Sequence, residues 1–150
     1  MVRMKIEIRE MMAEDLPKVA ALEQRIFSTP WSEKSFSTSL VSEDTGYFTA
    51  WVDGVFAGYC GYLRSFSEAD ITNVAVGEEF RSRGVGYAML HAMMESGRKK
   101  GIERYTLEVR VTNAAAIRLY EKLGFESVGI RPGFYEKPRE DALIMWTKGE

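Results

Sequence analysis

The chain has 150 residues, of which 45% are hydrophobic and 28% charged, and its formal net charge at pH 7 is −2. This length predicts one domain over residues 1–150, and the high apolar content with nearly balanced charge excludes intrinsic disorder. One cysteine and one histidine exclude an internal disulfide framework and leave almost no route to a zinc or haem site, so no metal is expected. Any catalysis must therefore depend on carboxylates, tyrosines, backbone amides or a cofactor.

The first half of the chain predicts two helices and three strands. An alternating stretch predicts a strand over residues 5–9. Asp15-Leu16-Pro17 opens a helix, since proline is tolerated in a first helical turn. The apolar stripe of that helix consists of Leu16, Val19, Ala20, Ile26 and Phe27. Ser32 caps a short second helix that ends near Leu40. Strands over 47–52 and 55–64 flank Asp53-Gly54, a dipeptide typical of tight hairpins.

The second half predicts strands alternating with helices. The expected strands are 69–76, 105–109, 125–131 and 142–146, and the expected helices are 84–100, ending at Gly101, and the segment from Asn113 to Leu123, ending at Gly124. Hairpins in the first half and strand–helix–strand crossovers in the second predict one α/β domain with a mixed sheet.

Charge is unevenly distributed along the chain. Residues 81–122 carry 9 basic and 4 acidic side chains, whereas residues 1–80 carry 7 and 13. A basic segment in an acidic chain indicates a locally held phosphorylated ligand, since nucleic acid requires a broader basic surface. Alternatively, several of these charges only decorate a helix and its exit. The sequence shows neither a signal segment nor a run of about 18 apolar residues, so a cytoplasmic protein without membrane or nucleic-acid contact is expected.

A glycine-containing loop is the most informative segment. Apolar strand residues 73–76 lead through Arg81-Ser82-Arg83-Gly84-Val85-Gly86 into the long helix. Free amides and the helix dipole attract anions at such a helix start, and the glycines let the backbone approach the anion closely. The spacing R-x-x-G-x-G fits neither a Walker loop nor a Rossmann fingerprint. By itself, a two-glycine turn is also a common helix start.

This loop resembles the acetyl-CoA pyrophosphate loop of the GNAT acyltransferase superfamily. Residues 113–125, with Asn113, Ala116, Leu119-Tyr120 and Gly124-Phe125, are similar to the second signature of that superfamily, N-x-x-A-x-x-L-Y-x-x-x-G-F. The resemblance extends from the first strand to Trp146. It implies a single GNAT-like α/β (α+β) domain, with about seven strands in a mixed, mostly antiparallel sheet and about four helices.

Three further segments narrow the resemblance. Residues 30–36, residues 107–110 and the tail from Arg131 to Met145 are together similar to RimI-type N-terminal acetyltransferases. Those enzymes acetylate the N-terminal alanine of small-subunit ribosomal protein eighteen. The resemblance therefore implies transfer of an acetyl group from acetyl-CoA to the N-terminal peptide of a ribosomal protein.

The same resemblance assigns the cofactor contacts. The pyrophosphate would be held by Arg81, Ser82, Arg83, Gly84, Val85, Gly86 and Tyr87, and the pantetheine arm by the strand edge at Val74, Ala75 and Val76. A backbone amide of that edge would polarise the thioester carbonyl. Asn113 would contact the cofactor from the next helix, although on spacing alone it is equally a plain helix cap. Ser82 and Tyr87 stand where many relatives have basic residues, whereas Arg81 and Arg83 remain.

Glu108 and Tyr120 are the candidate catalytic residues. Glu108 lies in an apolar strand, on the face opposite Leu107 and Val109, where an exposed or arginine-paired glutamate is the alternative. A modest carboxylate is a sufficient base for an α-amine of pKa about 7.7–8.0, whereas a lysine near 10.4 demands more. Tyr120 points inward from its helix, either as a core aromatic or as an acid that protonates or hydrogen-bonds the leaving thiolate.

Several roles stay open at this level. Trp31 and Tyr135 line the acceptor groove or simply pack. Cys60 is expected in the core and His91 on the surface. The acceptor is alternatively another protein N-terminus, a lysine side chain or a small amine, or the chain is a regulatory module that binds acyl-CoA without catalysis. A monomer or weak dimer is expected.

Overall fold

The computed structural model describes residues 4–148, and within them the chain forms one seven-stranded sheet in the order β1-β2-β3-β4-β5-β7-β6. The strands are β1 (Ile6–Glu10), β2 (Thr45–Val52), β3 (Val55–Ser65), β4 (Glu68–Val76), β5 (Arg104–Arg110), β6 (Phe125–Glu136) and β7 (Arg139–Thr147). The helices are α1 (Leu16–Ile26), α2 (Glu33–Leu40), α3 (Val85–Lys99) and α4 (Ala114–Lys122), with short 3-10 turns at Ala13–Asp15 and Glu78–Phe80. Strands β4 and β5 are parallel and the other neighbours antiparallel, which confirms the predicted mixed sheet.

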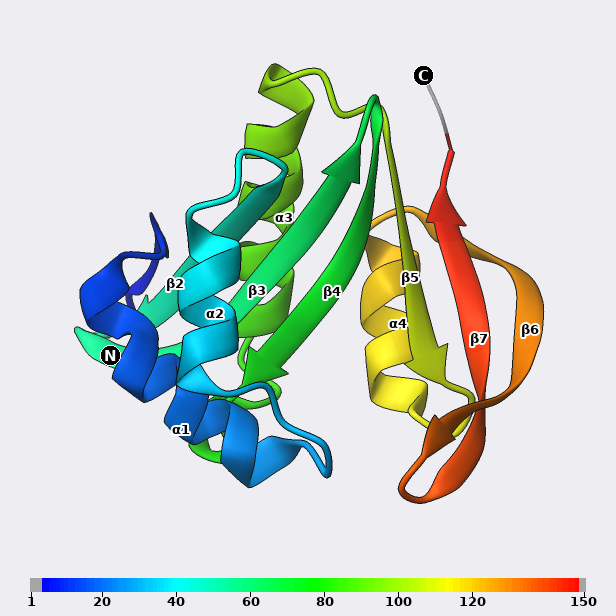
Figure 1. Cartoon of the computed structure of the whole chain (residues 1–150), viewed down its shortest axis with the longest axis horizontal. Helices are drawn as coiled ribbons and strands as arrows, with labels where there is room; N and C mark the ends of the chain where they lie inside the picture. Colours follow the sequence, from blue (N-terminus) through cyan, green and yellow to red (C-terminus); the bar gives the residue numbers. More distant parts are fainter. Residues whose placement is uncertain (1–3, 149–150) are drawn as a thin grey trace.

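Helices cover both faces of the sheet. Helices α1 and α2 lie in front of it in Figure 1, and α3 and α4 lie behind. The larger core cluster lies on the α3 side and includes Met89, Leu90 and Met93, each 0% exposed. The smaller cluster joins α1 and α2 to the sheet around Phe36 and Tyr59. No helix within residues 4–148 has the length and apolar character required to cross a membrane.

Local signals placed the turns and caps correctly. Asp53 and Gly54 have φ values of 49° and 83°, as the hairpin turn between β2 and β3 requires. The Ser32 hydroxyl accepts from the backbone N–H of Ser35 over 3.1 Å and caps α2. Phe27 was expected within α1, but the helix ends at Ile26 and Phe27 is 38% exposed.

The last two strands are longer than predicted. The predicted strand at 125–131 continues to Glu136, and its partner begins at Arg139 instead of 142. The register shifts between Arg131 and Tyr135, where Pro132 and Gly133 interrupt the ladder. Such a bulge bends a strand without ending it. Pro132 and Gly133 are typical of the end of a strand, but here they lie within a long curved hairpin.

Strands β4 and β5 separate soon after they pair. Their parallel ladder holds three pairs, Glu68 with Arg104, Ala69 with Tyr105 and Asp70 with Thr106. Beyond Asp70 the two strands diverge, as Figure 1 shows at the centre of the sheet. The facing edges of residues 71–76 and 107–110 consequently form no hydrogen-bonded ladder with each other. The sheet is therefore open near the carboxyl ends of two parallel strands, where ligands usually bind.

A bulge in β4 lies at the same place. Gly61 pairs with Asn73 and Tyr62 with Ile71, so Thr72 is the extra residue. Ile71 packs into the core on the α3 side, whereas Ala75 packs into the core beneath α1 and α2. Since side chains alternate along a strand, the bulge reverses which face the odd-numbered residues occupy.

Candidate active site

A cavity of about 840 Å³ opens where β4 and β5 diverge. Its walls come from the ends of these two strands, the connection between α1 and α2, the β6–β7 hairpin and the start of α4. The lining includes the predicted site residues Trp31, Val74, Glu108, Asn113, Tyr120 and Tyr135. Residues more than 100 positions apart in the chain thus meet at one place.

Glu108 lies on the cavity wall in a half-buried position. Leu107 and Val109 are buried on the opposite face of β5, as the alternation predicted. Burial raises the pKa of Glu108, the nearby Asp70 carboxylate raises it further, and Arg131 opposes the shift. A carboxylate with a raised pKa is a stronger base than an ordinary glutamate, which suits it to accept a proton from an amine.

Tyr120 points from α4 into the same cavity. Its side chain is 8% exposed, and its ring packs edge-on against Phe125 with centroids 5.8 Å apart. Burial raises the pKa of Tyr120 above its ordinary value, and Tyr135 and Cys60 add to the shift. The hydroxyl is therefore a weak acid that keeps its proton and can donate a hydrogen bond.

The glycine loop has the backbone conformation of an anion site. Ser82 and Gly84 have φ values of 63° and 83°, and Gly84, which precedes the first residue of α3, provides no side-chain cap. Amides in such left-handed turns converge, and a helix start that is uncapped offers its own amides. Arg81 is partly committed, since its Nε donates to the carbonyl of Val76 over 3.2 Å. Residues 81–87 lie outside the lining of the cavity, and Arg81 joins them to Val76 at the end of β4.

Gly84→Ala should separate the contribution of this loop to stability from its predicted role in binding acetyl-CoA. A Cβ at Gly84 meets no atom within 4 Å, so the cost is the left-handed conformation itself, about 1–2 kcal/mol of unfolding free energy. Gly54 has the same φ of 83° and equally open surroundings, so Gly54→Ala is a matched control. We expect similar falls in melting temperature for both variants, with a higher KM for acetyl-CoA in Gly84→Ala alone. An unchanged KM in both variants would argue against cofactor binding here.

The α1–α2 connection is fixed by a buried carboxylate. Glu23 is 3% exposed and accepts hydrogen bonds from the Tyr59 hydroxyl and, over 2.9 Å, from the backbone N–H of Trp31. The Trp31 ring packs on Phe36, with ring centroids 5.2 Å apart. Trp31 thus both lines the cavity and packs on Phe36, and its contact with an acceptor stays a prediction.

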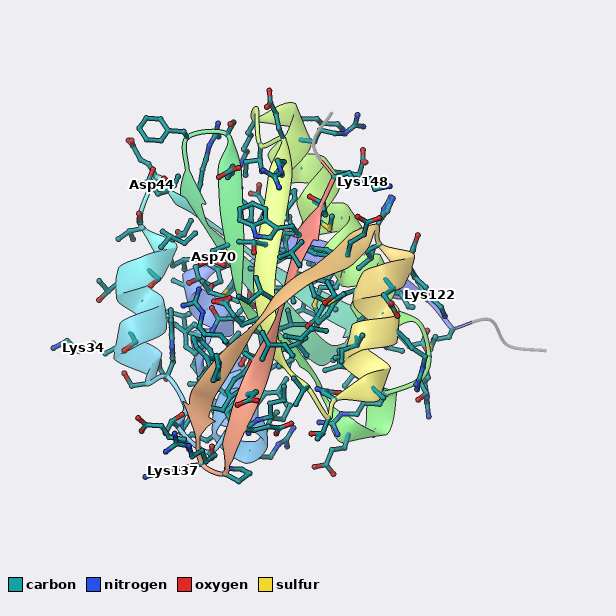
Figure 2. All side chains as sticks on the ribbon, turned by 90° about the vertical axis from the view of Figure 1, so that its right-hand side faces the viewer. Lys34, Asp44, Asp70, Lys122, Lys137 and Lys148 are labelled. Atoms are coloured by element: carbon teal, nitrogen blue, oxygen red, sulfur yellow. The ribbon has the colours of Figure 1, made fainter. Side chains whose placement is uncertain are left out.

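The opposite rim of the cavity is held by Arg110. Its guanidinium lies 4.3 Å from the centre of the Tyr135 ring, donates to Glu140 over 3.1 Å and donates to the carbonyl of Pro138 over 2.9 Å. The Ser28 hydroxyl donates to the carbonyl of Lys137 over 2.6 Å and joins this hairpin to the α1–α2 connection. This hydrogen bond ties together two rims from distant parts of the chain. Figure 2 labels Lys137, which lies at the turn between β6 and β7.

Not every predicted residue reaches the cavity. Ala75 and Val85 are buried in the core, at 4% and 1% exposure, so only their backbone atoms are available to a ligand. Val76 also lies outside the lining. The Asn113 side chain accepts from the backbone N–H of Ala116 over 3.2 Å, so it caps α4 and also lines the cavity. Cys60 is buried and His91 exposed, as predicted.

Three cavity residues were missed in the sequence. Glu23 lies within the apolar stripe of α1, and Asp70 is a carboxylate in an apolar strand. Either irregularity was a usable signal. A carboxylate in an apolar strand is also the signal that identified Glu108. Asn73, which is 5% exposed, gave no such signal, because a bulge that depends on pairing with β3 turns it toward the cavity. Among residues 4–148 there is no group of three or more side chains suited to holding a metal ion.

Comparisons with known proteins identify the family to which the chain belongs. The profile of the acetyltransferase (GNAT) family matches residues 16–125. The [ribosomal protein bS18]-alanine N-acetyltransferase of Escherichia coli K12 is 38% identical over 133 residues, covering 87% of this chain and 89% of that protein. The crystal structure of the ribosomal-protein-S18-alanine N-acetyltransferase from Escherichia coli has a TM-score of 0.86 and 36% identity, covering 95% of this chain and 93% of that one. Ard1 from Thermoplasma volcanium has a TM-score of 0.83 and 29% identity, covering 94% and 95% of the two chains. The chain therefore belongs to the GNAT family of acetyltransferases, as an acetyl-CoA-dependent N-acetyltransferase.

Proposed function

We propose that this enzyme acetylates the N-terminal alanine of ribosomal protein bS18. The observation that carries the proposal is the cavity at the β4–β5 divergence, which combines the half-buried carboxylate of Glu108 with the buried phenol of Tyr120. The similarity to enzymes named for this substrate, over most of both chains, supports the same acceptor.

The cosubstrate would be held mainly by backbone groups. When bound, acetyl-CoA supplies an acetyl group already activated as a thioester. The amides of residues 82–87 would contact its pyrophosphate, because the left-handed turns at Ser82 and Gly84 direct successive N–H groups toward one anion. The free edge of β4 beyond Asp70 would pair with the pantetheine arm, and an amide of that edge would stabilise the negative charge that develops on the carbonyl oxygen.

Glu108 would act as the general base. The α-ammonium of a peptide has a pKa of about 7.7–8.0, so removing its proton at pH 7 costs only about 1 kcal/mol. Glu108 takes this proton, directly or through one water, and the freed lone pair forms the new C–N bond as the C–S bond breaks. A carboxylate whose pKa is raised by burial suits an α-amine better than a lysine side chain.

Tyr120 would stabilise the leaving group. The raised pKa of Tyr120 makes complete proton transfer to a thiolate unfavourable, since an ordinary thiol has a pKa near about 8.5. Donation of a hydrogen bond to the departing sulfur is the role that this chemistry favours, and the thiolate then takes its proton from solvent.

A peptide panel tests the proposed acceptor. The full chain is incubated with acetyl-CoA and either the N-terminal peptide of bS18, the same peptide with its first alanine replaced by leucine, or a polyamine. We expect the highest kcat/KM with the alanine peptide. Acetylation of the polyamine without acetylation of the bS18 peptide would contradict the proposal.

A further inference from the structure

Two carboxylates flank the point at which β4 and β5 separate. Asp70 is the last residue of β4 that pairs with β5, opposite Thr106, and Glu108 lies two residues further along β5. Residues that pair across neighbouring strands point to the same face of a sheet, and so do residues two positions apart in one strand. Asp70, Thr106 and Glu108 therefore project from the same side of the sheet. Figure 2 places Asp70 on the side of the sheet toward α2. Both residues line the same cavity, and the charge of Asp70 acts on Glu108, so the two carboxylates lie near each other.

The other charged groups of the cavity are already engaged or lie at its rim. Glu23 accepts from Tyr59 and Trp31 with its two oxygens, and Arg110 is paired with Glu140. Glu136 and Lys137 are exposed at the rim. Across the described part of the chain, neither Asp70 nor Glu108 forms an ion pair. The guanidinium of Arg131, the nearby cation, lies over the Phe134 ring at 5.5 Å. The two carboxylates therefore lack a direct cationic partner within the protein.

A separate observation points to a ligand at the same wall. The Asn73 side chain lines the cavity and is 5% exposed, and its Oδ1 accepts from the Thr72 hydroxyl over 2.7 Å. Its amide nitrogen makes no hydrogen bond to any residue between 4 and 148. The nitrogen is not one of the fully buried polar atoms, so it faces the open cavity, where a ligand or an ordered water can accept its hydrogen bond. In a peptide, the first carbonyl, which could accept this hydrogen bond, is attached to the carbon that bears the ammonium group.

We propose that Asp70 and Glu108 together bind the α-ammonium group of the acceptor peptide, so that Asp70 is a second acceptor-binding residue. This inference rests on the proposed function and deepens it. At pH 7 an α-amine is mostly cationic, so it can donate one N–H to each carboxylate and its third N–H to water. Glu108 then removes a proton from the ammonium, while Asp70 keeps the nitrogen in place as its charge is lost.

A matched pair of ligands isolates the ammonium contribution. The probes are an alanine-initiated peptide and its desamino analogue, in which a propionyl group replaces the alanyl group, both titrated calorimetrically in the presence of CoA so that no transfer occurs. Asp70→Asn should weaken binding of the amino peptide by at least about fivefold and leave the desamino peptide unchanged. Glu68→Gln is the control, because it removes the same charge from the same face of β4 outside the cavity, where Glu68 pairs with Arg104.

Two results would overturn the proposal in distinguishable ways. If the native enzyme binds and acetylates the peptide but Asp70→Asn behaves like Glu68→Gln, or weakens both peptides equally, the role of Asp70 is wrong and the proposed function stands. If the native enzyme binds neither peptide, the role of Asp70 and the proposed function are both wrong.

The pH profile gives a second readout of the same pair. Asp70 on β4 and Arg131 and Tyr135 on β6 are the ionisable groups whose charges interact with Glu108. Removing the negative charge of Asp70 should lower the pKa of Glu108, so the acid limb of kcat/KM should move to lower pH in Asp70→Asn. An unmoved acid limb would contradict the pairing.

Discussion

Glu108→Gln should lower kcat/KM for the acceptor peptide by about 10²- to 10⁴-fold, the usual contribution of a general base. Glutamine keeps the size of the side chain and its place on the cavity wall but cannot accept the proton. The half-buried position means that the protein should remain folded, so the loss reflects the missing base and the missing contact with the α-ammonium group, not unfolding. Steady-state rates at saturating acetyl-CoA measure it.

The matched control for this variant is Glu126→Gln. Glu126 lies on β6, is exposed and pairs with Lys148 over 3.2 Å, so its loss should change kcat/KM little. The pH dependence adds a second criterion. Burial and Asp70 raise the pKa of Glu108 above 4.5, so the native acid limb should lie above that pH and disappear in Glu108→Gln. Native-like activity of Glu108→Gln would show that another group is the base.

Tyr120→Phe should lower kcat by about 10- to 150-fold, the equivalent of about 1.5–3 kcal/mol for a hydrogen bond to a charged group. The phenylalanine ring keeps the packing on Phe125, so the melting temperature should change little. Because the thiolate forms only as the C–S bond breaks, KM for both substrates should remain near its native value.

Tyr105→Phe provides the comparison for the phenol. Tyr105 is buried on β5 and donates to the carbonyl of Met94 over 3.1 Å, away from the cavity. Its loss should cost about 1 kcal/mol of stability and leave kcat unchanged. If Tyr120→Phe behaves in the same way, Tyr120 is a core aromatic without a role in the reaction.

Features specified by neighbouring residues could be predicted from the sequence. The Asp53-Gly54 turn, the Ser32 and Asn113 caps and the inward direction of Tyr120 each depend on a few adjacent positions. The alternation that places Glu108 opposite Leu107 is equally local. These signals located the elements and three of the residues that line the cavity, Glu108, Asn113 and Tyr120.

Features that depend on pairing between distant strands could not be predicted. The bulge at Thr72 arises from the register between β3 and β4, and it determines where Asn73 points. The end of the β4–β5 ladder at Asp70 opens the cavity, yet nothing in residues 68–76 alone marks that position. The continuation of β6 past Pro132 and Gly133 likewise depends on its partner β7.

The most direct test of this account uses one peptide that offers both kinds of amine. The peptide begins with a free alanine and carries an internal lysine, and tandem mass spectrometry locates the acetyl group after reaction with the native enzyme and acetyl-CoA. We predict acetylation at the α-nitrogen of the alanine, with the lysine left unmodified. Acetylation of the lysine ε-nitrogen in place of the α-nitrogen would contradict the account.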